Sequence, residues 1–208
     1  FSSPQIDDES RGFSFMADGQ LDMRMDTTSQ TSAKTIVNSF PLDELTKIIR
    51  EYGEEKDAYQ IAKNIIKVRE KKPIETTFEL VNIIKASKSN KELNKKGHPA
   101  KQTFQAFRIA VNDELNSLNE TLLKALRSLK KDGRLVVITF HSLEDRIVKQ
   151  TFNKVSKIIG NRNDDYELPN KKKLDYVLLN KDVITPSERE LIDNPRSKSA
   201  KLRGIKRV

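Results

Sequence analysis

The sequence predicts an α/β fold, and three consecutive patterns carry this prediction. Apolar residues recur at steps of three or four from Phe104 to Leu129, which predicts one long helix with a buried face. After an Asp-Gly turn, the apolar run over residues 134–140 predicts a buried strand. Ser142 is expected to open another helix, with Asp145 at the position of a capping-box acid. Helix, strand and helix in this order favour a doubly wound sheet with parallel strands.

Shorter helices are predicted earlier in the chain. Apolar residues share one helical face in each of three segments between residues 42 and 84. Pro41 fits the first turn of the first segment, Gly53 fits its end, and Thr76 with its neighbour can cap the third. The Lys-, Ser- and Asn-rich residues 85–97 predict a solvated loop.

The same patterns suggest how the chain is organised. Residues 1–36 lack sustained periodicity, so we expect an ordered active-site loop of the main domain. The narrow apolar stripes and many charges of residues 37–100 predict a small inserted helical domain, which we expect to recognise RNA. Residues 101–208 should complete the sheet of the main domain. Within them, residues 160–174 suggest a mobile connection, and the alternation over residues 199–208 predicts a terminal strand.

Composition restricts the function. The chain has 208 residues with 39 Lys and Arg against 30 Asp and Glu, a net charge of +9. Such an excess suits a polyanionic partner, although simple solubility explains it equally well. With no cysteine and two separated histidines, neither a disulfide framework nor a zinc centre is expected, and we predict no metal. No apolar run approaches the roughly 20 residues that span a bilayer, so the cytoplasm is the expected location.

Four blocks of sequence point to a known family. They are Phe1-Ser-Ser-Pro-Gln-Ile-Asp with Arg11-Gly-Phe-Ser-Phe and Leu21-Asp-Met-Arg-Met, then residues 98–112, 133–149 and 194–203. In this order they resemble the bacterial 16S rRNA (cytosine-N4)-methyltransferase family RsmH (MraW). The resemblance covers nearly all of this chain but only the back two-thirds of a family member, and the chain starts on Phe1 rather than Met. We therefore expect an N-terminally truncated chain.

The resemblance implies a fold and an activity. The fold would be a class I (Rossmann-like) S-adenosylmethionine-dependent methyltransferase whose last strand enters the sheet antiparallel. The reaction would be methylation of N4 of a cytidine in the decoding region of 16S rRNA, within the small ribosomal subunit. Gln5 is the one position that matches a cofactor-binding residue of the family, because the glycine-rich turn and the acids of that site precede this chain. Most contacts to S-adenosyl-L-methionine are therefore expected to be absent.

The candidate catalytic residues are Ser2, Ser3, Pro4 and His141. A turn over Ser2 to Pro4 would expose carbonyl and hydroxyl oxygens that accept the N4 hydrogens and align the amine. The alternative is an ordinary Ser-Pro turn. His141 follows the predicted strand and is interpreted as a substrate-pocket or loop-fixing residue, since amine methylation can release its proton to water.

Several candidates for substrate binding have a structural alternative. Phe13 and Phe15 could stack on a flipped base or plug the loop into the core. Asp22 and Arg24 could orient and contact RNA or cofactor, or could form an internal ion pair that fixes the loop.

The remaining substrate-binding candidates come from the later blocks. They are Arg108 and Asn112, from the block at 98–112, and Ser142, beside His141. Two other features of these blocks favour a structural interpretation: His98 is expected to be structural, and Glu144 and Asp145 are expected to serve the positive end of their helix rather than a paired-carboxylate hydrolase.

Basic side chains could together track an RNA backbone. They are Lys63, Lys67, Arg69, Lys71, Lys72, Lys95, Lys96, Lys101, Arg196, Lys198, Lys201 and Arg203. Two rival functions stay open. One is a non-catalytic RNA-binding protein on a truncated methyltransferase scaffold, and the other is a DNA amino-methyltransferase, which the Arg-Gly-Phe-Ser-Phe and Leu-Asp-Met-Arg-Met blocks argue against. Homodimer formation is also left open.

Overall fold

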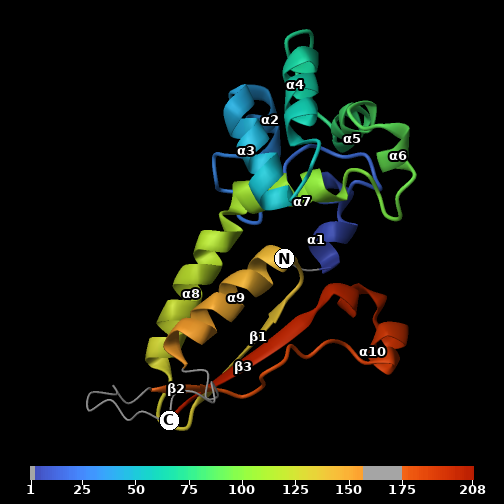
Figure 1. Cartoon of the computed structure of the whole chain (residues 1–208). Helices are drawn as coiled ribbons and strands as arrows, with labels where there is room; N and C mark the ends of the chain where they lie inside the picture. The colour runs from blue at the N-terminus through green and yellow to red at the C-terminus, as the bar shows by residue number, and fades with distance from the viewer. Residues whose placement is uncertain (1–2, 157–174) are drawn as a thin grey trace. The chain divides into compact units, whose positions relative to one another are not determined.

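The computed structural model describes residues 3–156 and 175–208. The chain divides into two compact units, Phe1–Glu114 and Leu115–Val208. Their helices and strands carry the labels of Figure 1. Within the described ranges, no helix has the length and apolar character needed to cross a membrane.

The first unit is built from helices. They are α1 (Ser3–Asp7), the 3-10 turn η1 (Glu9–Arg11), α2 (Ala33–Ser39), α3 (Leu42–Gly53), α4 (Ala58–Arg69), α5 (Thr77–Ala86), α6 (Asn90–Leu93) and α7 (Lys101–Asn112). The three short helices expected between residues 42 and 84 are confirmed as α3, α4 and α5. Helix α6 corrects the expected loop over residues 85–97, because Ser89 caps it by accepting a hydrogen bond from the Glu92 amide.

Capping explains where two of these helices begin. The Thr76 hydroxyl accepts the Glu79 amide, and the Glu79 carboxylate accepts the Thr76 amide in return, so the predicted cap of α5 is a full capping box. Helix α2, which the apolar pattern did not reveal, begins the same way, with Ser32 and Thr35 as the reciprocal pair. The hydroxyls of Ser32 and Thr76 thus determine where α2 and α5 begin.

One apolar core holds the first unit together. It includes Leu45 and Ile49 of α3, Phe107 of α7, and Leu21 and Met23 of the N-terminal loop, all fully buried. Helix α3 packs along α7, and both carry side chains of this core. The N-terminal loop is therefore anchored by buried side chains. The predicted boundaries of an inserted domain remain a prediction.

The predicted long helix from Phe104 to Leu129 is wrong in one respect. It is two helices, α7 and α8 (Glu114–Ser128), separated by Asp113 in the left-handed conformation with φ 46°. The Asp113 amide donates to the Ile109 carbonyl and so ends α7. Asn and Asp are weak helix formers that tolerate this conformation, and the continuous apolar pattern conceals the break.

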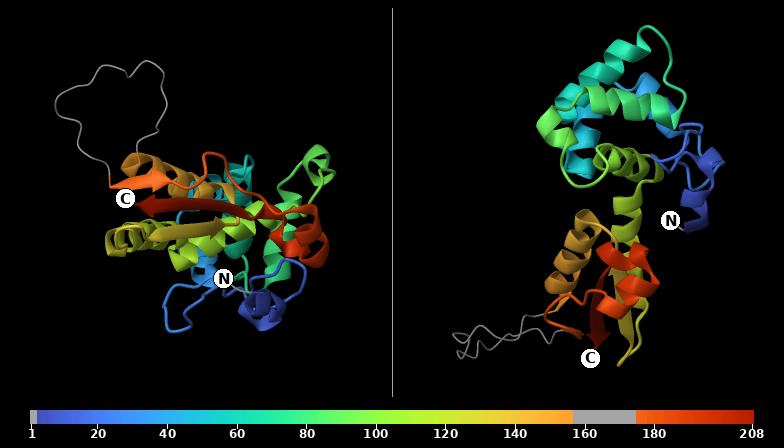
Figure 2. Two further views of the ribbon diagram at one scale, coloured as in Figure 1. Left: turned by 90° about the horizontal axis from the view of Figure 1, so that it is seen from below. Right: turned by 90° about the vertical axis from the view of Figure 1, so that its right-hand side faces the viewer.

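The second unit contains a three-stranded sheet. Its strands are β1 (Arg134–Thr139), β2 (Tyr176–Leu178) and β3 (Lys201–Arg207), in the order β1-β3-β2. Strand β3 pairs antiparallel with both neighbours, with Ile205 opposite Leu135 on one side and Leu178 on the other. Figure 2 (left) shows β3 between the other two. The antiparallel terminal strand is confirmed, whereas the described strands do not form the expected parallel pairs. The class I fold itself stays a prediction.

Helices α8 and α9 (Ser142–Val155) supply apolar side chains to one face of this sheet. There Leu122, Leu126, Val148 and Phe152 surround Ile205. The other face of β1 leaves Val136 and Ile138 about half exposed, at 52% and 55%. The expected strand buried on both faces is therefore wrong for the described chain, because its side chains alternate between a covered and an open face.

The C-terminal part of the second unit also contains α10 (Glu188–Asp193) and the 3-10 turn η2 (Pro195–Ser199). Helix α10 is capped by Ser187, whose side chain accepts a hydrogen bond from the Glu190 amide. The predicted mobile connection at residues 160–174 lies outside the described residues.

Candidate functional site

The opening segment is a helix rather than the predicted turn. Ser3, Pro4 and Gln5 belong to α1, and the Pro4 carbonyl already accepts a hydrogen bond from the Asp8 amide. The turn expected to present free carbonyls is therefore wrong for Ser3 and Pro4. Proline suits the first turn of a helix, where its missing N–H would have no helical partner. Ser2 lies outside the described residues, and the catalytic and cofactor roles of this segment remain predictions.

The two neighbouring blocks of the N-terminal loop are joined by hydrogen bonds. The Met23 amide donates to the Arg11 carbonyl at 3.0 Å, and the Arg11 guanidinium donates to the Arg24 carbonyl at 2.7 Å. Between them, Gly12 adopts the left-handed conformation with φ 68°. The Arg-Gly-Phe-Ser-Phe and Leu-Asp-Met-Arg-Met segments therefore form one structural piece.

Asp22 and Arg24 form an ion pair inside this loop. Arg24 Nε and Nη2 donate to the two Asp22 carboxylate oxygens at 2.7 and 2.9 Å, and Arg24 Nη1 donates to the carbonyls of Thr27 and Ser29. The hydrogen bond from Arg24 lowers the pKa of Asp22 below its usual value. This geometry favours the loop-fixing interpretation, while contact with RNA or cofactor stays a prediction.

Asn112 connects the loop to α7. Its side-chain oxygen accepts the Met25 amide at 2.7 Å, and its side-chain nitrogen donates to the Met23 carbonyl at 2.8 Å. One turn earlier, Arg108 forms a two-pronged ion pair with Glu114 at 2.7 and 2.9 Å. Both side chains thus act on the protein itself, and Asn112 positions the loop that the resemblance assigns to the site.

A hollow of about 270 Å³ opens where this loop meets α7. We call it the Phe13 hollow; its lining includes Ile6, Phe13, Phe15, Lys101, Phe104 and Arg108. Phe13 is only 7% exposed, so its core role is confirmed, yet its ring still forms part of the wall. Lys101 is exposed at the rim. Aromatic walls with cations beside them suit a planar, electron-rich ring that carries phosphate.

Phe15 has a partner that no sequence pattern had indicated. Its ring stacks on His98 with centroids 4.6 Å apart and an interplanar angle of 12°, and its edge meets Phe104 at 5.7 Å. Burial, and then the charge of Lys85, lower the pKa of His98 below its usual value. The one signal for this contact in the sequence is the position of His98 at the start of the block 98–112.

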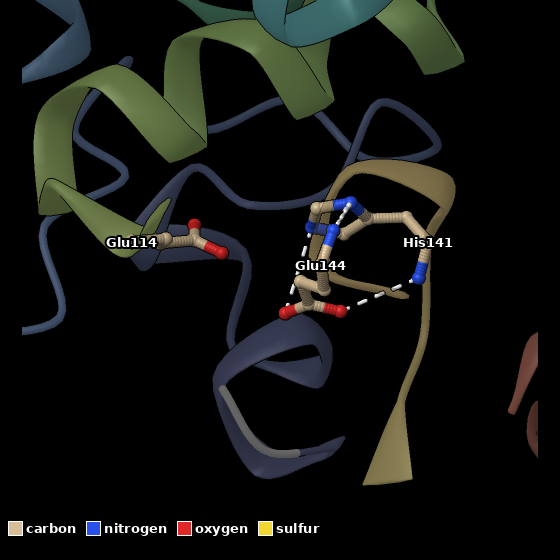
Figure 3. Close-up of side chains that lie close together, drawn as sticks. All are labelled: Glu114, His141 and Glu144. Carbon is tan, nitrogen blue, oxygen red and sulfur yellow. Dashed lines mark hydrogen bonds and ion pairs between the residues drawn. The ribbon is translucent and has the colours of Figure 1, made fainter. Parts of the chain in front are cut away.

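His141 caps α9. Its Nδ1 accepts the Glu144 amide, while Glu144 Oε2 accepts the His141 amide at 3.3 Å (Figure 3). The same Oε2 accepts the Phe140 amide at 2.8 Å. The capping box therefore lies one residue earlier than predicted from Ser142 and Asp145. A loop-fixing role for His141 fits this geometry. Ser142 is the exposed first residue of α9, and its role in substrate binding stays a prediction.

Asp145 has a different task from the predicted one. Its carboxylate lies 2.7 Å from Arg203 Nε and 3.5 Å from Lys201 Nζ, so it ties α9 to β3. The side chains of Asp145 and Arg203 are only 12% and 15% exposed. The hydrogen bond from Arg203 holds the pKa of Asp145 below its usual value. Arg203, a candidate RNA contact, is therefore engaged within the protein.

The Asp145 pair gives a testable dependence on pH. Because the folded pKa of this carboxyl is depressed, its stabilisation is present above the usual value of 3.8 and is lost as pH falls through the folded pKa. Asp145→Asn should lower the free energy of unfolding by about 2–4 kcal/mol at neutral pH and flatten its decline in acid. Urea unfolding across a pH series measures both effects. Glu120→Gln, which removes the exposed pair with Lys124, should change little; equal losses would contradict this account.

The other basic candidates divide by their contacts. Arg69 donates to the Val37 carbonyl, Lys72 pairs with Glu79, and Lys95 pairs with Glu92. Lys72 and Lys95 are nevertheless exposed, as are Lys63, Lys67, Lys71, Lys96, Lys101, Arg196 and Lys198. RNA contact by any of them remains a prediction, and the exposed group offers the more accessible charges.

Two glycines of the N-terminal loop, Gly12 and Gly19, offer no cradle for S-adenosylmethionine. A glycine cradle needs open space beside the backbone, but a Cβ on Gly12 or Gly19 would lie 2.1 or 2.0 Å from a carbonyl oxygen of the protein. Gln5 is thus the one described residue to which the resemblance gives a cofactor contact.

Comparison with known proteins assigns the family. The geometry describes a mixed α/β protein with an aromatic hollow beside a structured loop, and residues 1–208 match the MraW methylase family. The chain is 49% identical over 207 residues to the ribosomal RNA small subunit methyltransferase H of Streptococcus dysgalactiae subsp. equisimilis, and 50% identical over 206 residues to that of Leuconostoc mesenteroides subsp. mesenteroides. A Streptococcus pyogenes serotype M4 protein of the same name is 49% identical.

These alignments cover 99–100% of this chain but only 65–66% of each relative. The chain therefore spans just under two thirds of the length of the curated relatives it matches. It belongs to the MraW methylase family.

Proposed function

We propose that the full-length protein methylates N4 of a cytidine in the decoding region of 16S rRNA, with S-adenosyl-L-methionine as the methyl donor. The relatives are named small subunit rRNA methyltransferases, which supports the rRNA substrate and the reaction class. The choice of N4 and of the decoding region rests on the resemblance of the blocks. The residues of the relatives that this chain does not span would supply most of the cofactor site.

The Phe13 hollow is the observation that best supports a nucleobase substrate. Its rings come from two family blocks, the loop with Phe13 and Phe15 and helix α7 with Phe104. Its volume of about 270 Å³ lies near the lower end of typical ligand pockets, which begin at about 300 Å³. That size suits one planar base rather than a duplex, so the target nucleotide would enter unpaired.

This chain's residues would act by positioning. The lining of the Phe13 hollow would hold a flipped base and leave its amino edge free to turn toward a methyl donor. Lys101 at the rim is placed to neutralise a backbone phosphate. When bound, the cofactor supplies an electrophilic methyl group. The exocyclic nitrogen then loses one proton, which water can accept, so the site needs no strong base.

The decisive experiment is a methyl-transfer assay with the full-length protein, labelled S-adenosylmethionine and small ribosomal subunits that lack the modification. We expect label in the 16S rRNA, and nucleoside mass spectrometry should find N4-methylcytidine. Duplex DNA is the control and should stay unlabelled. Binding to subunits without methyl transfer would instead favour the non-catalytic RNA-binding alternative, and methylation at another atom would refute the N4 assignment.

A binding assay with small ribosomal subunits tests the proposed basic surface. Lys63 and Lys67 lie one turn apart on α4, Lys71 follows the helix, and all three are exposed. Reversing their charges to Glu should weaken subunit binding and lower the slope of log affinity against log salt by about one per lysine. The control reverses the exposed Lys124, Lys149 and Lys154 of α8 and α9. Equal effects in both sets would reject a specific RNA surface in residues 37–100.

A further inference from the structure

A second hollow shares part of its wall with the first. We call it the Phe78 hollow; it has a volume of about 280 Å³, and its lining includes Phe15, Met16, Phe78, Asn82, Lys85 and His98. Phe15 and Met16 also line the Phe13 hollow, so the two hollows adjoin along these side chains. Two adjacent hollows of similar size are suited to two successive units of one linear ligand.

The shared wall is held in place by ring contacts. The stacked His98 ring and the edge contact with Phe104 fix Phe15 from two directions. Since His98 covers one face of Phe15, that face is closed to a ligand. The aromatic surface that remains open in the Phe78 hollow belongs to Phe78, which is 41% exposed, beside Met16, which is 71% exposed. Exposed side chains of this size often mark a binding surface.

Helix α5 arranges three kinds of side chain along the hollow. Phe78, Asn82 and Lys85 are spaced by four and three residues, so they follow one another on a single helical face. They offer a ring for stacking, an amide for hydrogen bonding and an ammonium for a phosphate. Among the described residues, none that lines this hollow is acidic. A nucleotide offers a base for the ring, polar atoms for the amide and a phosphate for the ammonium, so the three side chains suit this class of ligand.

His98 adds a hydrogen-bond donor. Its Nδ1 accepts the Ala100 amide at 3.2 Å, which places the proton of the neutral ring on Nε2. Burial, and then the charge of Lys85, lower the pKa of His98 and so favour the neutral ring. A neutral ring with a fixed N–H donor can bind an acceptor atom of a base or ribose.

We propose that the Phe78 hollow binds an unpaired nucleotide next to the target cytidine, with its base against Phe78 and Met16 and its phosphate near Lys85. This inference rests on the proposed function, because the Phe13 hollow is taken as the site of the target base. Proteins read single-stranded RNA by splaying successive bases onto aromatic side chains, with cations along the backbone. Phe15 and Met16, which line both hollows, would lie between the two successive bases and keep them apart.

The test measures binding of the full-length protein to a short single-stranded oligoribonucleotide with one cytidine, by fluorescence anisotropy. Matched oligoribonucleotides carry an abasic position on the 5′ or the 3′ side of the cytidine. Phe78→Leu keeps apolar bulk but removes the ring, and should weaken binding of the intact RNA about tenfold. On one of the two abasic RNAs, Phe78→Leu and the unaltered protein should bind equally. Phe78→Tyr should restore affinity.

The control is Tyr59→Leu, because Tyr59 is an aromatic residue of α4 that is 53% exposed outside this hollow. It should leave binding unchanged. The proposal is overturned if Phe78→Leu has no effect, or if its loss is the same on all three RNAs. Methyl transfer to small subunits by the unaltered protein reports separately on the proposed function. If the protein transfers methyl groups but Phe78→Leu does not show the expected dependence on the abasic position, only this inference is refuted. If Phe78→Leu shows that dependence but the protein transfers no methyl group, only the enzymatic assignment is refuted.

Discussion

Gly12→Ala is expected to destabilise the N-terminal loop strongly. The residue has φ 68°, which costs an L side chain about 1–2 kcal/mol, and an added Cβ would lie 2.1 Å from the Gln20 carbonyl oxygen and 2.8 Å from the Asp22 amide. Both contacts are backbone atoms, so no flexible side chain can move aside. We expect a loss of at least about 3 kcal/mol in the free energy of unfolding.

Hydrogen exchange in the full-length protein measures this loss locally. The amides of Leu21 and Met23, which bond to Glu75 and Arg11, should exchange faster in Gly12→Ala. Gly97→Ala is the matched control, because Gly97 also has positive φ, 107°, but has no atom within 4 Å of the added Cβ. It should cost only the backbone strain. If both variants exchange alike, the close approach at Gly12 is not important for stability.

Asn112→Ala is expected to release the loop from α7 and to lower methyl transfer more than its loss of stability explains. Alanine leaves the Met25 amide and the Met23 carbonyl without their side-chain partner, at about 1–3 kcal/mol for each group that stays buried. The loop lies against the Phe13 hollow, so its displacement should raise KM for the subunit and reduce kcat. Steady-state kinetics of the full-length protein, corrected for the folded fraction, measure both.

Asn38 provides a close control for this variant. Its side chain accepts the Ile74 amide at 2.9 Å and donates to the Ile74 carbonyl at 2.8 Å, and it also bonds the carbonyl four residues earlier, as Asn112 does. Asn38→Ala should therefore cost similar stability without altering kinetics. Equal kinetic losses in the two variants would show that Asn112 supports the fold and does not position the site.

Helices could be predicted where local signals coincide. Helices α3 and α5 combine an apolar stripe with Pro41 and Gly53 or with Thr76 at their ends, whereas α4 was indicated by its apolar stripe alone. The break at Asp113 could not be predicted from periodicity, because apolar residues continue at helical spacing on both sides. The sequence does not distinguish a turn from a helix start at Pro4, because proline suits both the second position of a turn and the first turn of a helix.

The pairing of strands that lie far apart in the sequence was harder to predict than the helices. The run 134–140 is apolar on both faces of a strand, which is typical of a parallel sheet, and the alternation of burial depends on which neighbours are present. The resemblance supplied the antiparallel last strand; local sequence alone indicated only its existence. Register, such as Ile205 opposite Leu135, depends on contacts across some 70 residues and has no local signal.

For the candidate site, the sequence predicted which segments come together, but it did not predict the side-chain contacts within them. The blocks around Phe13, Arg24 and Asn112 do meet in the first unit, as the family pattern suggested. What could not be predicted is which polar groups are already satisfied, as in Arg24 with Asp22 or Arg203 with Asp145. Such pairs depend on side-chain geometry. In the sequence alone, a charged residue that pairs within the protein looks the same as one that faces solvent.

The strand order of the second unit has a consequence for synthesis on the ribosome. Strand β3 lies in the middle of the sheet, yet it follows β1, β2 and both covering helices in the sequence. Within the described residues, a nascent chain therefore carries β1 and β2 without their shared partner until residues 201–207 leave the exit tunnel, because neither strand pairs with the other. The described helices of the first unit all precede β1 in the sequence and therefore emerge earlier. A nascent chain stopped before residue 201 would thus leave β1 and β2 without the strand that joins them and open to capture by chaperones.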